Sequence, residues 1–359
     1  MESRRALISA ALLVASCPVR AQAQSDSLNQ GVLSVMGFVD AYYAYDFGHS
    51  ANDDRPPFLY QYDRHNEVDL NLGLLHVGYA RQRMRAALGL MAGTYPQANL
   101  MAEPEMLRNV YEARVGLKLS QGKSIWLDAG IFPSHIGLES ALGIDNWTLT
   151  RTMIAENSPY YLSGARLTWT VSSKLEVAAL VVNGWQRIRR VQNNTPCVGT
   201  QLVWTPRPDM KFNWSTFAGS DVPDSLGYYR AFNNLYWIWE GSKWGVQLGG
   251  DIGLQENARG GWSTWGGVVG IVRRKLGEDF AVAVRAEHYN DPDQVMVPTG
   301  TRHGLTAMGY SLGLDFKVIE DGFVRIEGRT FHGTDEIFED VHGSTQDNTA
   351  ITASMAVRF

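Results

Sequence analysis

The last ten residues, AITASMAVRF (residues 350–359), show the pattern that decides the fold of this chain. Every second residue is apolar, and these residues are Ile351, Ala353, Met355, Val357 and Phe359. The positions between them include Thr352, Ser354 and Arg358. A period of two places alternate side chains on opposite faces, which is typical of a β-strand with one apolar and one polar face.

The same alternation occurs in EVDLNLGLL (residues 67–75), YEARVGLKL (residues 111–119) and FVRIEGRTF (residues 323–331). In the third stretch, for example, Ile326 separates Arg325 from Glu327. We expect the charged faces to point into a polar lumen and the aliphatic faces to point towards lipid. A soluble β-sandwich or propeller would alternate in the same way, but its strands would be shorter than these runs of about ten residues, which suit a tilted membrane strand.

Marking every alternating run predicts sixteen strands, at residues 32–46, 64–79, 83–95, 108–119, 124–133, 159–171, 174–186, 197–205, 210–219, 231–240, 244–255, 262–274, 280–290, 305–317, 323–333 and 347–359. Long connections alternate with tight, turn-like ones such as SQGK, PRPD and IEDG. This layout is typical of an outer-membrane barrel with long external loops and short periplasmic turns. The predicted fold is therefore an all-β, transmembrane, antiparallel up-and-down barrel of about 16 strands, and a missed pair of short strands would change the count to about 14 or 18.

The N-terminus has the features of an export signal. Arg4 and Arg5 precede an apolar run at residues 6–15, and Ala21-Gln22-Ala23 fits a small-residue cleavage site. The pattern predicts a signal peptide at residues 1–23 and a barrel domain at residues 24–359, in the outer membrane of a Gram-negative bacterium. The alternative is a lipoprotein site with Cys17 acylated.

Charge and cysteine content exclude several classes of protein. Removing residues 1–23 takes away three arginines and one glutamate, so the formal charge changes from −5 to −7, which argues against nucleic acid as a partner. Cys197 is then the only cysteine, so no internal disulfide forms. No other run approaches the roughly 18 apolar residues of a helical membrane span. The expected partners are membrane lipid, lipopolysaccharide and small hydrophilic solutes or ions.

One long stretch, GIFPSHIGLESALGIDNWTLTRTMIAENSPYY (residues 130–161), is charged and has no period. Its central part, residues 134–158, is the third and longest external connection. A barrel of about sixteen strands leaves an aqueous channel, so we expect this loop to fold inward and constrict it. The loop carries the charged residues Glu139, Asp145, Arg151 and Glu156.

The phase of alternation directs basic residues of the neighbouring strands inward, namely Arg83, Arg85, Arg114 and Arg166. Acidic loop residues would then face basic wall residues, an arrangement by which pores sort ions and polar solutes. The alternative interpretation is that the loop charges only hold the loop against the wall through salt bridges and caps, and the two roles are compatible.

Aromatic residues are frequent near the ends of the predicted strands. They include Tyr42, Tyr43, Tyr45, Tyr95, Trp169, Trp185, Trp204 and Phe217. Amphipathic rings favour the membrane–water boundary, so we expect these side chains to lie on the outer surface at that level.

Residues 130–161 resemble the most recognisable stretch of the OmpL-like family of outer-membrane β-barrel porins. The resemblance is carried by GIFPSHIGLES (residues 130–140), DNWTLTR (residues 145–151) and AENSPYY (residues 155–161), and it extends from about residue 35 to the end of the chain. It implies a porin for passive diffusion of small hydrophilic solutes and ions. It also implies a pore-lining or loop-anchoring site that adds Ser134, His135, Trp147 and Asn157 to the four charged loop residues.

Signatures of catalysis are missing from the sequence. We find no Gly-rich phosphate loop, metal-spaced Cys/His cluster or nucleophile elbow, so we expect no catalytic residue, cofactor or metal. Two alternatives stay open: an outer-membrane barrel enzyme of the lipase or protease type, which would need a histidine bonded to both a serine and a carboxylate, and a plugged barrel that binds a surface partner. A monomer and a homo-oligomer are equally open.

Overall fold

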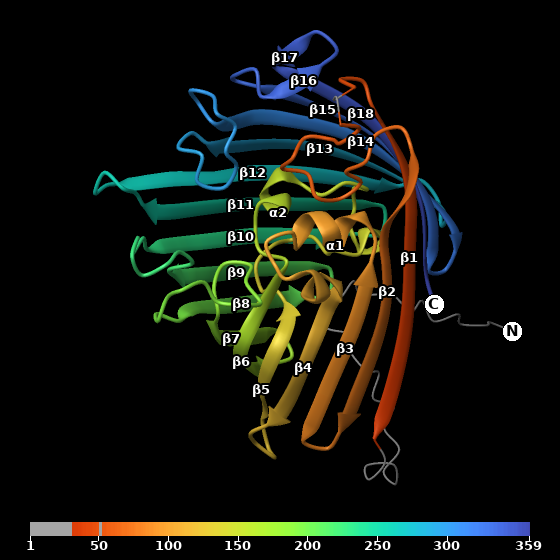
Figure 1. Ribbon diagram of the computed structural model, residues 1–359. Helices are drawn as coiled ribbons and strands as arrows, with labels where there is room; N and C mark the ends of the chain where they lie inside the picture. The colour runs from red at the N-terminus through yellow and green to blue at the C-terminus, as the bar shows by residue number, and fades with distance from the viewer. Residues whose placement is uncertain (1–30, 50–51) are drawn as a thin grey trace, which may run out of the picture.

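The computed structural model describes residues 31–49 and 52–359. The predicted signal peptide and Cys17 lie outside the described residues. Sixteen strands form one closed barrel in which every strand is antiparallel to both neighbours (Figure 1). The first strand pairs with the last, so the barrel has no open edge. Closure is needed in lipid because unpaired backbone groups there cost several kcal/mol each, roughly.

The barrel strands are β1 (Val32–Asp46), β2 (Val68–Arg81), β3 (Met84–Ala92), β4 (Val110–Lys118), β5 (Ser124–Pro133), β6 (Tyr161–Ser172), β7 (Leu175–Val182), β8 (Cys197–Arg207), β9 (Met210–Gly219), β10 (Arg230–Glu240), β11 (Trp244–Glu256), β12 (Trp262–Lys275), β13 (Phe280–Asp291), β14 (Leu305–Ile319), β15 (Gly322–Gly333) and β18 (Asp347–Arg358). The predicted sixteen-stranded barrel is confirmed. A small hairpin of β16 (Phe338–Asp340) and β17 (Gly343–Thr345) lies in the last external connection.

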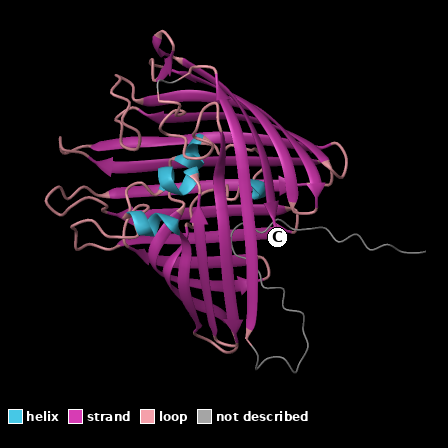
Figure 2. Ribbon diagram, turned by 45° about the vertical axis from the view of Figure 1, so that its right-hand side comes forward, coloured by secondary structure: helices cyan, strands magenta, loops and turns pink. Residues whose placement is uncertain are grey.

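The helices among the described residues are α1 (Thr94–Asn99), α2 (Met153–Glu156) and the 3-10 turns η1 (Glu105–Asn109) and η2 (Gly143–Asp145). None of them is long and apolar enough to cross a membrane. Figures 1 and 2 both draw α1 and α2 within the outline of the barrel. α1 contacts β2 and β3, whereas α2 contacts β12 and β13.

The predicted faces are confirmed in the strands that carry the clearest alternation. In β18, Ile351 and Met355 are exposed on the outer face, whereas Thr352 and Ser354 are buried. In β15, the charged residues Arg325, Glu327 and Arg329 are buried, whereas Ile326 is exposed. The buried polar face of each strand is therefore the lumen face, and the exposed aliphatic face is the one that meets lipid.

In β2 the predicted faces are wrong from Leu72 onward. Ala41 of β1 pairs with Leu70 and Asp40 pairs with Leu72, so Asn71 is the extra residue of a β-bulge. A bulge shifts the alternation by one residue, and the following aliphatic side chains change face. Leu72 and Leu74 are consequently buried inside the barrel.

The buried core of this molecule lies inside the barrel. Four of the aromatic residues expected at the membrane boundary, Tyr42, Tyr95, Trp185 and Phe217, are buried there, so the expectation is wrong for them. Tyr43, Trp169 and Trp204 are exposed on the barrel, as expected for boundary residues. Some of the large aromatic residues thus lie on the outer surface, and others pack in the interior of the barrel.

Candidate functional site

Residues 134–158 connect β5 to β6 and contact strands on the far side of the barrel. Thr150 donates from its backbone nitrogen and its hydroxyl to Glu327 of β15, at 2.9 and 2.7 Å. The backbone nitrogen of Met153 donates to Glu287 of β13 at 2.6 Å. Around the ring of strands, β15 is six places from β5 and β13 is seven places from β6. The connection therefore forms hydrogen bonds with strands on the opposite side of the ring of strands.

A network of four buried charges receives this connection on the far wall. Arg285 donates to Glu327 at 2.6 Å, and Arg329 donates to Glu287 at 2.7 Å. Arg285 also donates to the carbonyl oxygen of Thr150 at 2.6 Å. All four charged side chains are at most 2% exposed, and two positive charges balance two negative ones. Charge-assisted hydrogen bonds of this kind are strong, and removing one partner leaves a buried charge uncompensated.

Glu139 is held within residues 134–158 itself. Its Oε2 accepts hydrogen bonds from the backbone nitrogen and the hydroxyl of Thr152, at 2.7 and 2.8 Å. Thr152 in turn caps the N-terminus of α2 by accepting from Ala155 at 3.3 Å. Burial raises the pKa of the Glu139 carboxyl above its ordinary value. Glu139 therefore organises the start of α2.

Arg151 and Glu156 form an enclosed ion pair. Their side chains lie 2.6 Å apart, at 0% and 1% exposure. The guanidinium lies 3.5 Å from the ring centroid of Tyr160 and 5.0 Å from that of Tyr95, both in cation–π geometry. Glu156 also accepts from the backbone nitrogen of Tyr60 at 3.1 Å. The pair thus binds the connection to the first external loop and to α1.

Asp145 is the most exposed of the four charged residues of this connection. Its side chain is 28% exposed and pairs with Arg358 of β18 at 2.9 Å. Arg358 also pairs with Asp321, in the turn between β14 and β15, at 2.8 Å. Burial raises the pKa of Asp145, and the nearby Arg358 opposes that rise. Asp145 is thus the loop carboxylate with the greatest contact with water.

Three of the predicted wall arginines surround one carboxylate. Arg85 of β3 and Arg114 of β4 both form ion pairs with Asp128 of β5. Asp128 is the register partner of Arg166 of β6, whose guanidinium lies 4.9 Å from the ring centroid of Phe132. These four charged side chains come from four consecutive strands on one wall of the lumen.

Arg83 does not belong to this group. It lies in the turn between β2 and β3, is exposed, and donates to the carbonyl oxygen of Lys118 at 3.2 and 3.1 Å. The backbone nitrogen of Lys118 donates to the carbonyl oxygen of Arg83 at 2.8 Å, so Arg83 continues the pairing of β3 with β4, and its inward direction stays a prediction.

His135 fixes the first part of the connection to β9. Its Nε2 bonds to the carbonyl oxygen of Thr216 at 2.8 Å, and its own carbonyl oxygen accepts from Ser215 at 2.6 Å. Burial lowers the pKa of His135 to about 4, so the ring is neutral near pH 7 and Nε2 is the donor. Ser134 accepts from the backbone nitrogen of Ile136 at 3.1 Å, which forms a local turn.

Trp147 and Asn157 occupy two further structural positions. Trp147 is buried against Gly245 of β11, where a Cβ atom would lie 2.4 Å from the indole ring. Only glycine permits so close an approach at that position. Asn157 donates to the carbonyl oxygen of Met153 at 2.9 Å and closes the C-terminus of α2.

The first external connection also packs into the barrel, which the sequence analysis missed. Gln61 donates to the carbonyl oxygen of Ala141 at 2.6 Å, and the hydroxyl of Tyr62 donates to Asp40 at 2.8 Å. Phe58 packs edge-on against Phe331 with ring centroids 6.1 Å apart. The signal that could have revealed this is FLYQY (residues 58–62), an aromatic run in a connection that should otherwise be polar.

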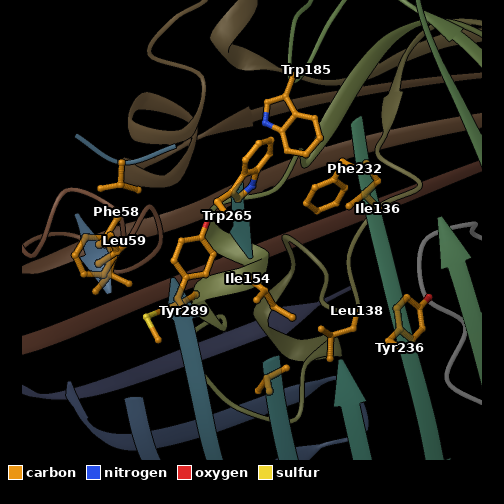
Figure 3. Packing of buried hydrophobic residues seen from close by; sticks show 14 of the residues in the cluster. Phe58, Leu59, Ile136, Leu138, Ile154, Trp185, Phe232, Tyr236, Trp265 and Tyr289 are labelled. Atoms are coloured by element: carbon orange, nitrogen blue, oxygen red, sulfur yellow. The ribbon is translucent and has the colours of Figure 1, made fainter. Parts of the chain in front are cut away.

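An aromatic cluster joins these connections on the β9 to β13 side (Figure 3). Trp185 lies with its ring centroid 5.1 Å from Phe217, 4.8 Å from Phe232 and 6.3 Å from Trp265, all in T-shaped geometry. Figure 3 shows Ile154 and Leu138 of residues 134–158 in the same cluster. Such pairs add about 0.5–1.5 kcal/mol each beyond the burial of their area.

The model of one protein family matches nearly the whole described chain. The description of that family is "Putative beta-barrel porin-2, OmpL-like", and the match covers residues 32–359. The chain belongs to this family. The chain is thus an outer-membrane β-barrel protein, as the sequence resemblance implied. No curated protein sequence matches it.

Solved porin structures are similar to this chain in fold. An anion-selective porin from Comamonas acidovorans aligns with a TM-score of 0.62 at 10% identity, over 92% of this chain and 100% of that chain. OmpT from Vibrio cholerae aligns with a TM-score of 0.58 at 7% identity, over 94% and 99%. OmpF from Salmonella typhi, solved in complex with daunomycin, aligns with a TM-score of 0.58 at 10% identity, over 91% and 97%.

Proposed function

We propose that this porin allows passive diffusion of small hydrophilic solutes and ions through a lumen that residues 134–158 narrow to a charged constriction. The observation that carries the proposal is the set of hydrogen bonds between this connection and Glu287 and Glu327 on the opposite wall. Sixteen strands would otherwise enclose a wide aqueous tube of low selectivity.

We further propose that the charged residues divide into two groups by their contact with water. Glu139, Arg151 and Glu156 are enclosed and hydrogen-bonded, which supports an anchoring role for them. Asp145, Arg85 and Arg114 retain partial exposure, at 28%, 29% and 16% of their side chains, which supports a role in lining the path. The proposal thus combines the two interpretations drawn from the sequence and assigns them to different residues.

Asp145→Asn is expected to shift ion selectivity towards anions. The substitution removes one water-exposed negative charge from the lumen and leaves Arg358 with only Asp321 as its acidic partner. The reversal potential under a KCl gradient should move by several millivolts, on the order of the effect of one charge in a lined pore. Asp209→Asn, in an exposed pair outside this connection, is the control and should leave the potential unchanged.

Planar-bilayer recording of the purified protein tests the function. Stable ohmic current steps are expected, whereas a well-folded barrel that stays silent would contradict passive diffusion. A silent barrel would favour the alternative of a plugged, surface-binding protein, for which the packed external connections are the motivating feature. A solved form of V. cholerae OmpT is described as a trimer, so crosslinking in the same preparation should test for a homo-oligomer.

A barrel enzyme has less support. Nε2 of His135 bonds to a backbone carbonyl oxygen, and its Nδ1 has no hydrogen-bond partner among the described residues. A hydrolase triad would instead place a serine and a carboxylate on the two ring nitrogens. Lipase and protease assays on the purified protein should therefore give only background rates.

A further inference from the structure

Five charged side chains form a group on the lumen wall of β3 to β6, which we call the arginine cluster. Its members are Arg85, Arg114, Arg166, Glu112 and Asp128. Arg85 and Arg114 both form ion pairs with Asp128, and Arg114 forms a second one with Glu112. His76 bonds to Glu112 at 2.8 Å and adds no charge while it is neutral. Three positive charges against two negative ones leave the cluster with a net charge of +1.

The guanidiniums of the arginine cluster have more contact with water than its carboxylates. Arg85 and Arg114 are partly exposed, whereas Asp128 and Glu112 are less than a tenth exposed. Arg85 reaches Asp128 across Gly116 of β4, which is the register partner of both residues. A Cβ at Gly116 would lie 2.8 Å from Cγ of Arg85, so glycine lets the arginine cross the strand. The face that the cluster presents to the lumen is therefore basic.

Arg166 has the free donors that an anion needs. No hydrogen bond or ion pair joins its guanidinium to another described residue, and its buried Nε has no partner among them. The guanidinium packs on Phe132, 4.9 Å from the ring centroid. Asp128 attracts its charge and Arg114 repels it, so Arg166 lies within electrostatic reach of the other cluster members. A buried donor without a partner is costly, and a bound anion would supply that partner.

The barrel wall carries no side chain at two positions beside Arg114 and Arg166. Gly130 of β5 is the register partner of Arg114. It also pairs with Gly164, two residues before Arg166 on the same face of β6. The φ angles of the two glycines are 130° and 157°, and a Cβ on either would lie 2.2 Å from a backbone carbonyl oxygen, so both positions require glycine. The wall itself thus leaves room for a small ion next to the two guanidiniums.

The acidic residues of the connection between β5 and β6 do not balance the charge of the cluster. Glu139 and Glu156 are buried, and both are held by hydrogen bonds or an ion pair. Asp145 is partly exposed, but it pairs with Arg358. The network around Arg285 on the far wall has no net charge. The unbalanced charge among these groups is therefore that of the arginine cluster.

We infer that the arginine cluster binds small oxyanions, with Arg114 and Arg166 as donors, and makes the channel anion-selective. This inference rests on the proposed channel function and specifies its solute class. Arg114 bonds to the carboxylates through Nε and Nη1, so its Nη2 remains available. A guanidinium fork matches the oxygens of an oxyanion in bidentate geometry. A net positive charge in a water-filled lumen raises the local concentration of anions and lowers that of cations.

The zero-current potential in a KCl gradient, recorded in planar bilayers with the full-length protein, tests the selectivity. The wild type should favour chloride over potassium by about threefold, the effect of one unbalanced charge in a water-filled lumen. Arg166→Met removes that charge and leaves the ion pairs of Asp128 in place, so the ratio should fall to about one. Arg166→Lys keeps the charge and should keep the wild-type ratio. Arg207→Met, in an exposed pair with Asp209, is the control and should also keep it.

Sulfate tests the binding site separately from the charge of the lumen. Added sulfate should reduce the chloride current of the wild type at concentrations well below that of chloride, because it occupies the cluster. Arg166→Met should weaken this block about tenfold, the worth of one charge-assisted hydrogen bond. Arg166→Lys should weaken it about threefold, because a lysine ammonium lacks the fork. Arg273→Met removes a lumen-facing arginine that pairs with Asp315 on another wall and should keep the wild-type block.

The outcomes distinguish the site from the channel, once heat-modifiable migration on gels has verified that each barrel is folded. A conducting wild type that favours potassium or neither ion, or a ratio that Arg166→Met leaves unchanged, would overturn the inference and leave the channel intact. Equal loss of sulfate block in Arg273→Met and Arg166→Met would also overturn the site, because the effect would then come from lumen charge in general. A folded barrel without any current would overturn the channel and the site together.

Discussion

Arg285→Met is expected to raise the single-channel conductance severalfold and to make residues 134–158 accessible to proteases. The substitution removes the donor to Glu327 and to the carbonyl oxygen of Thr150, at a site that is 0% exposed. Breaking a buried pair by removing one partner costs about 3–5 kcal/mol because the other charge stays uncompensated. The cost of the uncompensated Glu327 charge falls if the connection moves away from the far wall, because water can then hydrate the carboxylate.

A second substitution distinguishes this cause from general destabilisation of the barrel. Adding Glu327→Gln to Arg285→Met removes the negative charge of Glu327 that the first substitution leaves uncompensated. Part of the lost stability should therefore return, while the contact with Thr150 stays weakened. Arg207→Met, in a pair with Asp209 at 57% exposure, is the control and should change neither conductance nor stability measurably. Unchanged conductance in Arg285→Met with a folded barrel would contradict the anchoring role.

Trp185→Ala is expected to have the second largest effect. Deletion of a buried aromatic side chain should lower the free energy of unfolding by on the order of 3–5 kcal/mol. Trp185 contacts Phe217, Phe232 and Trp265 and receives the Arg230 guanidinium at 5.0 Å from its ring centroid. Its loss should loosen the external connections while the hydrogen-bonded ladder of the barrel persists. The measurements are limited proteolysis of those connections and open-channel noise in planar bilayers.

Trp262→Ala provides the matched control for that experiment. Trp262 stands on β12, as Trp265 does, but it is 51% exposed and lies outside the cluster. Its removal should leave proteolysis and channel noise at wild-type levels. Equal effects of Trp185→Ala and Trp262→Ala would show that the aromatic cluster has no specific role in holding the external connections in place.

The barrel could be predicted from the sequence because membrane strands repeat one constraint many times. The predicted ranges 32–46, 124–133 and 210–219 agree with β1, β5 and β9 at both ends. Each lipid-facing position must be apolar and each connection is either a tight turn or a long loop, so the errors at individual ends do not accumulate. The largest errors, of four residues each, are at the start of β2 and at the end of β7, and the predicted end at residue 95 is wrong by three residues because α1 begins at Thr94.

Bulges and the packed interior could not be predicted in the same way. The bulge at Asn71 reverses the faces of Leu72 and Leu74, and the bulge at Tyr111 turns a ring into the lumen. Neither leaves a mark in the apolar–polar pattern, because both depend on the register with a neighbouring strand. Tyr42 and Trp185 look like boundary residues in the sequence for the same reason: an aromatic ring suits either environment.

The candidate site could be predicted only in part from the sequence. Charged residues in an aperiodic connection indicated a functional or anchoring segment, and Arg85, Arg114 and Arg166 were placed on one wall by alternation alone. Which loop charges meet water depends on long-range partners such as Arg358 for Asp145, more than 200 residues away. Spacing along the chain carries no information about such partners, so exposure could not be assigned before the fold was known.

The most direct measurement is the conductance of a barrel that lacks the connection. Pro133 pairs with Tyr161, and Ser134 donates to the carbonyl oxygen of Tyr160 at 2.9 Å, so a short Gly/Ser turn can replace residues 136–157 without disturbing β5 or β6. We expect a folded barrel whose single-channel conductance is severalfold above that of the wild type. A folded barrel with wild-type conductance would show that residues 134–158 do not narrow the lumen.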